Sequence, residues 1–236
     1  MAAAFVGNLP GHLVARRRPA ASPHIRHFLT AAGRAFGLRV TIAGTPLPRD
    51  VLFVANHVSW LDILALGGAT GTAFVSKDDV AGWPLVGWMA REAGTIFIRR
   101  QRHAVRGQAD ELGRALAAGR AVALFPEGTT GRGDALLPFR AALLAAVADA
   151  PAGVRVQPVA IDYGAAARDI AWTNNEGTIG NVRRVGGRAD RLRVTLRFLP
   201  PIDPAGMDRK AIAAAAREAI GRALSESGTI AYEAAP

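Results

Sequence analysis

The sequence of 236 residues lacks cysteine and lacks any long apolar run. Without cysteine there are no disulfides, thiolate metal sites or cysteine nucleophiles, which fits a reducing compartment. A membrane-spanning helix needs about 20 mostly apolar residues, and charge or proline breaks the best candidates, such as residues 135–150. The N-terminus also lacks the order of a secretion signal, because the arginines at 16–18 follow its mildly apolar stretch. We therefore expect no helix that spans a membrane.

Acidic residues are missing from the first fifth of the chain. The first one is Asp50, although the whole chain carries a net charge of +10. Seven arginines precede it: Arg16, Arg17, Arg18, Arg26, Arg34, Arg39 and Arg49. A segment of this kind favours a polyanionic partner, either nucleic acid or anionic lipid headgroups. The composition does not choose between them.

The N-terminal segment divides into an arm and a helix. Residues 1–22 are predicted to form a loose basic arm, because prolines interrupt them. Residues 24–38 have apolar positions at helical spacing among basic ones, which predicts a basic amphipathic helix. It would lie in a membrane interface or pack on the domain with a solvated basic face. We assign residues 1–40 to the arm and membrane-interface helix, and residues 41–236 to an α/β domain.

Strand-like and helix-like segments alternate after Pro48. Strands are predicted at residues 51–55, 72–76, 95–98, 121–125 and 154–161, and an edge strand at 191–199. Helices are predicted from residue 61 and at 84–92, 104–118, 140–147 and 208–224, whereas residues 164–190 give no clear pattern. Strands separated by helices predict an α/β fold with a mostly parallel sheet, covered by helices on both faces.

The sharpest chemical pattern is Asn-His-Val-Ser-Trp-Leu-Asp at residues 56–62, between a strand and a helix. Ser59 and Asp62 have the spacing of a helix N-terminal box. His57 then lies in the preceding loop, toward which Asp62 can fold back. A carboxylate on one ring nitrogen fixes the tautomer and leaves the other nitrogen as a base. Alternatively, His57 only caps or packs.

Two further segments could bind an anion. Residues 125–133, Phe-Pro-Glu-Gly-Thr-Thr-Gly-Arg-Gly, form a glycine-rich loop after an apolar strand. It is not a Walker loop, because no Gly-Lys-Ser/Thr follows, and an ordinary turn is the alternative. Arg99 and Arg100 end another strand, where paired arginines suit phosphate or form a solvated edge.

In order and spacing these segments resemble the motif blocks of the glycerophospholipid acyltransferase family, typified by 1-acylglycerol-3-phosphate acyltransferase. Asn56, His57, Ser59 and Asp62 match Asn-His-x-Ser-x-x-Asp. Residues 94–100 resemble Gly-x-x-Phe-Ile-x-Arg, residues 125–129 resemble Phe-Pro-Glu-Gly-Thr, and residues 156–161 resemble the apolar block that follows. The resemblance covers roughly residues 45–165.

The resemblance implies an acyltransferase of phospholipid biosynthesis. A fatty acyl group would pass from acyl-CoA or acyl carrier protein to the free hydroxyl of 1-acylglycerol-3-phosphate, giving phosphatidate. His57 would be the general base and Asp62 the orienting group, with direct transfer and no acyl-enzyme. No cluster of histidines and carboxylates has the spacing of metal ligands, so we expect no bound metal and no cofactor beyond the acyl donor. The residues that would bind the substrate are Lys77, Arg100, Glu127, Gly128, Thr129 and Arg132.

It also implies a peripheral or monotopic enzyme on an anionic membrane surface, at the cytoplasmic face, with no nucleic-acid partner. Two positions depart from the family pattern. Arg99 stands where an acid is usual, and Thr130 stands where an arginine is usual. Both touch the region that would hold the acceptor headgroup, so another lysolipid, such as lyso-ornithine lipid, is the alternative acceptor. A non-enzymatic basic module that binds membrane or nucleic acid is the more distant alternative.

Overall fold

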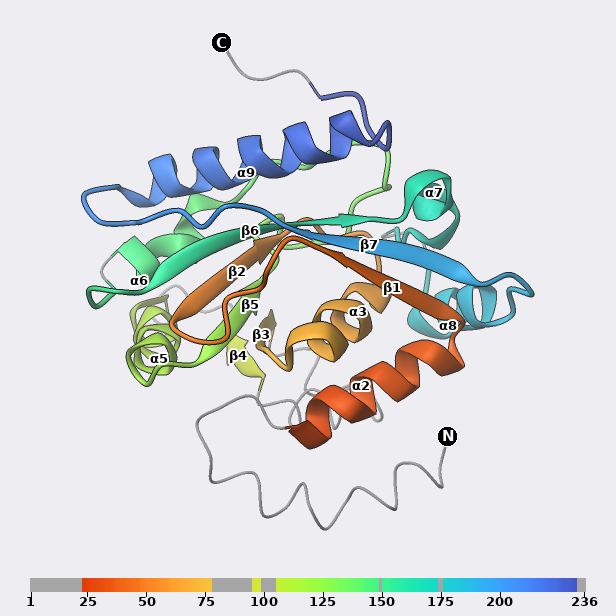
Figure 1. Cartoon of the computed structure of the whole chain (residues 1–236), viewed down its shortest axis with the longest axis horizontal. Helices are drawn as coiled ribbons and strands as arrows, with labels where there is room; N and C mark the ends of the chain where they lie inside the picture. The colour runs from red at the N-terminus through yellow and green to blue at the C-terminus, as the bar shows by residue number, and fades with distance from the viewer. Residues whose placement is uncertain (1–22, 78–94, 99–104, 149, 174–175, 233–236) are drawn as a thin grey trace.

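A seven-stranded sheet forms the centre of the molecule (Figure 1). The computed structural model describes residues 23–77, 95–98, 105–148, 150–173 and 176–232. The strands run in the order β1 (Leu38–Ala43), β7 (Leu192–Phe198), β6 (Arg155–Asp162), β2 (Val51–Ala55), β5 (Ala121–Leu124), β3 (Ala73–Lys77) and β4 (Ile96–Ile98). Every neighbouring pair is parallel except β6 with β7. The predicted mostly parallel sheet is confirmed.

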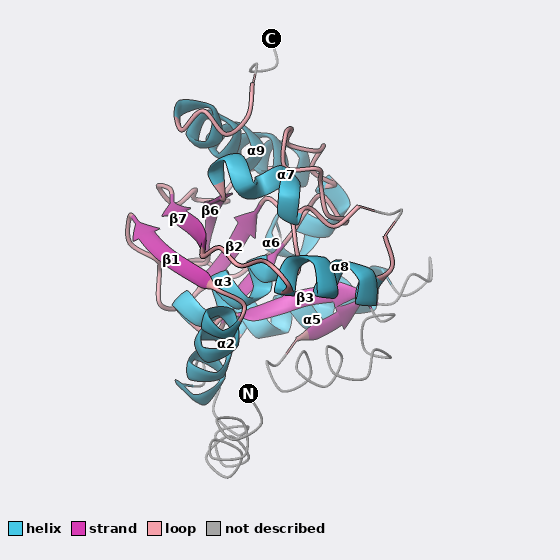
Figure 2. Ribbon diagram, turned by 90° about the vertical axis from the view of Figure 1, so that its right-hand side faces the viewer, coloured by secondary structure: helices cyan, strands magenta, loops and turns pink. Residues whose placement is uncertain are grey.

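Helices cover both faces of this sheet, as predicted (Figures 1 and 2). One core contains side chains of α2 (Pro23–Ala35), α3 (Leu61–Thr70), α7 (Ala167–Ile170) and α8 (Thr178–Gly186). The opposite core contains side chains of α5 (Val105–Ala117), η2 (Ala141–Leu144), α6 (Ala145–Ala148) and α9 (Arg209–Glu226). Strand β2 contributes side chains to both cores, because all five of its residues are buried and alternate between the two faces.

The sequence-based prediction was wrong for two strands. Residue 38 was assigned to the end of a helix, but α2 ends at Ala35 and Leu38 begins β1. Residues 191–199 were assigned to an edge strand, but β7 lies between β1 and β6, and β1 is the edge. The alternation of β7 has another cause: its even-numbered residues are buried, while the residues between them lie on the less covered face.

Two helical segments also differ from expectation. The helix predicted at 140–147 is a 3₁₀ turn, η2, followed by the short helix α6. Residues 164–190 contain η3 (Gly164–Ala166), α7 and α8. The helix expected at 84–92 and the arm at 1–22 lie outside the described residues.

Helix α2 packs closely on α3 through glycine. Thr30 Oγ1 donates to the carbonyl of Gly68 at 3.0 Å, and a Cβ on Gly68 would lie 2.9 Å from that hydroxyl. In the described part of the chain, no helix combines the length and apolar character needed to cross a bilayer. A membrane-interface role for residues 1–40 stays a prediction.

Candidate active site

The loop that carries His57 begins at the carboxyl end of the central strand β2 and is fastened there by Asn56. The Asn56 amide donates to the carbonyl of Ile161 at 3.0 Å, and its oxygen accepts from the Ile161 amide at 2.8 Å. Ile161 lies in the neighbouring strand β6, so Asn56 joins two strands near their carboxyl ends. In parallel sheets, active sites form at these ends of the strands. Asn56 therefore fixes the start of the His57 loop.

Asp62 folds back from the first turn of α3 onto this loop, as the spacing predicts. Its Oδ2 lies 2.8 Å from His57 Nδ1 and accepts the amides of Val58 and Ser59 at 2.7 and 2.9 Å. The bond from the Ser59 amide is one half of the expected helix N-terminal box. The other half is missing, because the Asp62 amide donates to the Ser59 carbonyl at 3.0 Å instead of to its hydroxyl. The buried carboxylate is thus fixed by backbone amides.

Tyr163 supplies the fourth hydrogen bond to Asp62. Its hydroxyl donates to Oδ1 at 2.7 Å, and the ring is buried just beyond β6. Burial, and then the Asp62 carboxylate, raise the pKa of this phenol well above its usual value, so the phenol remains a donor at physiological pH. Sequence reasoning missed Tyr163, although its position directly after the block at 156–161 was the available signal.

The imidazole of His57 is fixed on two sides. Asp62 holds Nδ1, and the ring stacks on Phe125 with centroids 4.1 Å apart and planes 12° apart. Its side chain is 17% exposed, whereas Asp62 is fully buried. The arrangement leaves Nε2 as the nitrogen that can take a proton from an incoming hydroxyl.

The glycine-rich loop holds the backbone of His57 from both sides. Glu127 Oε1 accepts the His57 amide at 3.0 Å, and the Gly131 amide donates to the His57 carbonyl at 2.7 Å. Burial raises the pKa of Glu127 from 4.5 to about 8, against the lowering effect of hydrogen bonds from the amides of His57 and Leu137. This carboxyl positions the His57 loop, and its contact with substrate stays a prediction.

The remaining predicted substrate-binding residues divide into two groups. Gly128, Thr129 and Arg132 lie in the glycine-rich loop beside His57, and Arg132 is exposed. Gly128 has φ +69°, and a Cβ there would lie 3.2 Å from the Arg140 side chain, so glycine suits this turn. Arg100 and the side chain of Lys77 lie outside the described residues.

The segment after β6 closes on the His57 loop through Trp172. The hydroxyl of Thr130 donates to the Trp172 carbonyl, and the Trp172 amide donates to the Val58 carbonyl at 3.0 Å. Nearby, the indole of Trp60 donates to Asn181 of α8 at 2.9 Å. Sequence reasoning found none of these contacts, because residues 164–190 carry no periodic pattern.

The chain is similar to known proteins over most of its length. The family described as Acyltransferase matches residues 39–162. A lyso-ornithine lipid O-acyltransferase of Pseudomonas aeruginosa is 38% identical over 202 residues, which cover 84% of this chain and 77% of that protein. A 1-acyl-sn-glycerol-3-phosphate acyltransferase of Neisseria gonorrhoeae is 40% identical over 131 residues, which cover 54% of this chain and 49% of that protein.

Among solved structures, the chain is similar to the 1-acyl-sn-glycerophosphate acyltransferase of Thermotoga maritima. The TM-score is 0.65 at 25% identity, and the match covers 89% of this chain and 80% of that one. The residues matched by the family include His57, Asp62 and Glu127, whereas Tyr163 and Trp172 lie beyond them.

Proposed function

Since the chain belongs to the Acyltransferase family, as a lysolipid acyltransferase, we propose that its acceptor is lyso-ornithine lipid and that His57 is the general base. The observation that carries the catalytic assignment is the hydrogen bond of 2.8 Å between His57 Nδ1 and Asp62. It holds the proton on Nδ1 and leaves Nε2 as the base.

The proposed reaction is a direct transfer. As the acceptor hydroxyl attacks the thioester carbonyl of acyl-CoA or acyl carrier protein, its proton passes to His57 Nε2. The new ester bond forms, the carbon–sulfur bond breaks, and the departing thiolate takes the proton back from the imidazolium. Asp62 stabilises the imidazolium throughout, because its carboxylate is buried beside the ring. The chain has no cysteine for a thioester intermediate.

Two observations favour lyso-ornithine lipid over 1-acylglycerol-3-phosphate as the acceptor. The alignment with the Pseudomonas protein covers 84% of this chain, against 54% for the Neisseria protein. In addition, Thr130 occupies the position where the family pattern usually has an arginine, and its hydroxyl donates a hydrogen bond to the Trp172 carbonyl. That position therefore presents no cation to a phosphate monoester. Exposed Arg132, two residues later, keeps 1-acylglycerol-3-phosphate as the second candidate.

The proposed location is the surface of a membrane, at the cytoplasmic face. The proposed acceptor is a membrane lipid, and the chain carries a net charge of +10. Positive charge attracts a protein to anionic headgroups at about 1 kcal/mol for each basic residue near the surface.

The test of the acceptor is a comparison of kcat/KM in detergent. Labelled acyl-CoA and acyl carrier protein are each offered with lyso-ornithine lipid, 1-acylglycerol-3-phosphate and other lysolipids. We expect lyso-ornithine lipid to be preferred by at least about tenfold, or about 1.4 kcal/mol in transition-state binding. A preference of that size for 1-acylglycerol-3-phosphate would reverse the assignment and leave the acyltransferase reaction intact.

A further inference from the structure

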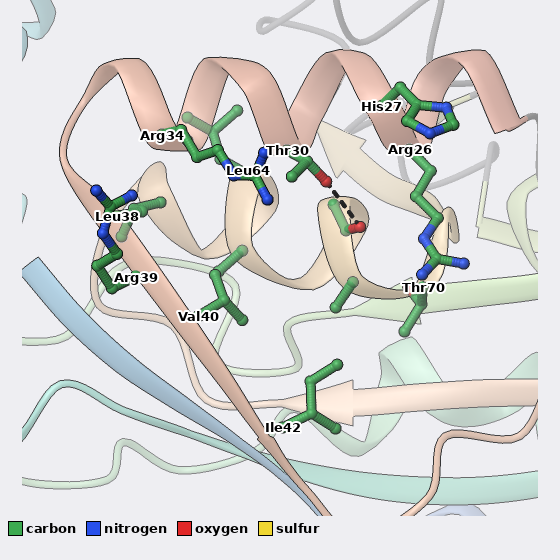
Figure 3. A pocket seen from close by; sticks show the side chains of 14 residues that line it. Arg26, His27, Thr30, Arg34, Leu38, Arg39, Val40, Ile42, Leu64 and Thr70 are labelled. Carbon is green, nitrogen blue, oxygen red and sulfur yellow. Dashed lines mark hydrogen bonds between the residues drawn. The ribbon is translucent and has the colours of Figure 1, made fainter.

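A groove lies between α2, α3 and the edge strand β1 (Figure 3). Its volume is about 720 Å³, within the range of about 300–1,000 Å³ that is usual for small-molecule sites. None of its described lining residues belongs to the cluster around His57. The groove is therefore separate from the candidate active site.

The floor of the groove is an uncovered part of the sheet. Leu38, Val40 and Ile42 alternate along β1 and so point to the same face. Leu38 is 2% exposed, but Val40 and Ile42 are 41% and 47% exposed. Leu64 of α3 extends this apolar floor. Two exposed aliphatic side chains, side by side in a groove, suit an apolar ligand.

The ends of the groove are basic. Arg34 and Arg39 lie at the end near Leu38, and Arg26 lies at the opposite end near Thr70 (Figure 3). No acidic side chain lines the groove within the described residues. An arginine pair offers donors in the fixed geometry that matches phosphate oxygens. The groove thus combines an anion-binding end with an apolar floor.

We propose that this groove binds one anionic phospholipid of the membrane. The phosphate lies between Arg34 and Arg39, and one acyl chain runs along Val40, Ile42 and Leu64. The bound lipid anchors the enzyme to the surface from which the catalytic site draws its acceptor. This inference rests on the proposed function only in requiring that the enzyme works at a membrane.

Charge complementarity selects this occupant over the others. Residues 1–22 of the chain contain three arginines and no acidic residue, and a second copy would also bring a net charge of +10. Both would add positive charge to a basic groove. A nucleic acid would supply phosphate but would leave the apolar floor against water.

The test uses the full-length chain and dihexanoyl phosphatidylglycerol below its micelle concentration, with binding measured by calorimetry. Vesicles of phosphatidylcholine with and without phosphatidylglycerol provide a sedimentation assay. Two variants address the two parts of the groove: Arg34→Gln with Arg39→Gln at the basic end, and Ile42→Glu on the floor. Arg209→Gln with Lys210→Gln is the matched control, since both residues are exposed at the start of α9 on the opposite face.

We expect one lipid bound per chain for the wild type and for the control. Both groove variants should weaken short-chain lipid binding by tenfold or more, and Ile42→Leu should retain it. Equal binding by groove variants and control would overturn the proposal in favour of general surface attraction. Complete competition by equimolar inorganic phosphate would also overturn it, because the acyl chain would then contribute nothing.

An acyl-transfer assay in detergent with the same proteins distinguishes this proposal from the proposed function. Wild type that binds one lipid but transfers no acyl group in detergent would contradict the proposed reaction and support the groove. Wild type that transfers acyl groups but shows no difference between groove variants and control would contradict the groove alone.

Discussion

At the scale of single residues, the site depends on how completely Asp62 is hydrogen-bonded. Two backbone amides and His57 share Oδ2, and among the described residues Tyr163 alone reaches Oδ1. The amides fix the carboxylate in place, and the tyrosine satisfies the oxygen that faces away from the ring. The strength of the His57–Asp62 pair therefore depends on Tyr163, which lies 101 positions after Asp62 in the chain.

Tyr163→Phe tests this dependence. Removing a hydrogen bond to a charged group should cost about 1.5–3 kcal/mol of unfolding free energy. Without the hydroxyl, Oδ1 keeps no hydrogen bond within the described residues, so the carboxylate is held less firmly against His57 Nδ1 and kcat should also fall, by about tenfold. An unchanged kcat in a destabilised variant would show that Tyr163 only packs.

Glu127→Gln tests whether the buried carboxyl that accepts the His57 amide has a raised pKa. Burial raises the pKa of Glu127 from 4.5 to about 8, so between these values the unfolded chain loses a proton that the folded chain keeps. The unfolding free energy of the wild type should therefore fall as pH rises through this window, by up to about 1.4 kcal/mol per pH unit from this group. Glutamine keeps an acceptor for the His57 amide and does not titrate.

The measurement is urea unfolding of both proteins at pH 5, 6, 7 and 8. The free energy of unfolding of the glutamine variant, relative to that of the wild type, should increase with pH and should be smallest at pH 5. Parallel curves across the whole range would contradict a raised pKa for Glu127.

At the scale of elements, periodicity predicted most strands and helices but not their positions in the sheet. Residues 38–42 alternate apolar and polar side chains, yet the helical pattern before them was extended through Leu38. The alternation of charged and apolar residues at 191–199 arises because one face of β7 is poorly covered, although β7 is an interior strand of the sheet. Position in a sheet is set by pairing between distant segments, so a local pattern cannot predict it.

Gly68→Ala tests the contact that places α2 on α3. A Cβ would lie 2.9 Å from the Thr30 hydroxyl and 3.1 Å from its backbone nitrogen, so the two helices must separate. We expect a loss of about 1–3 kcal/mol, as for other overpacked sites. Gly113→Ala in α5 is the control, because a Cβ there meets nothing within 4 Å. The control should gain about 0.5–1 kcal/mol from helix propensity.

Thermal and urea unfolding of the two variants give the comparison. Equal stability changes would mean that the interface between α2 and α3 is not closely packed at Gly68.

At the scale of the whole molecule, the site lies at the carboxyl ends of adjacent strands. His57 follows β2, Glu127 follows β5 and Tyr163 follows β6, and β2 is the central strand of the three. The sequence could predict the His57–Asp62 pair, because the two residues lie only five positions apart, within one loop and the helix start that follows it. It could not predict the contacts of Glu127 or Tyr163, because only the order of strands brings them to His57.

The most direct test of the account is acyl transfer to lyso-ornithine lipid by wild type and His57→Ala, with unfolding curves for both. His57 is partly exposed and its removal leaves Asp62 held by two amides, so the variant should fold. Its kcat should fall by about 10²–10⁴, the usual contribution of a general base. A folded variant that retains more than about a tenth of the wild-type kcat would contradict the role of His57 as general base.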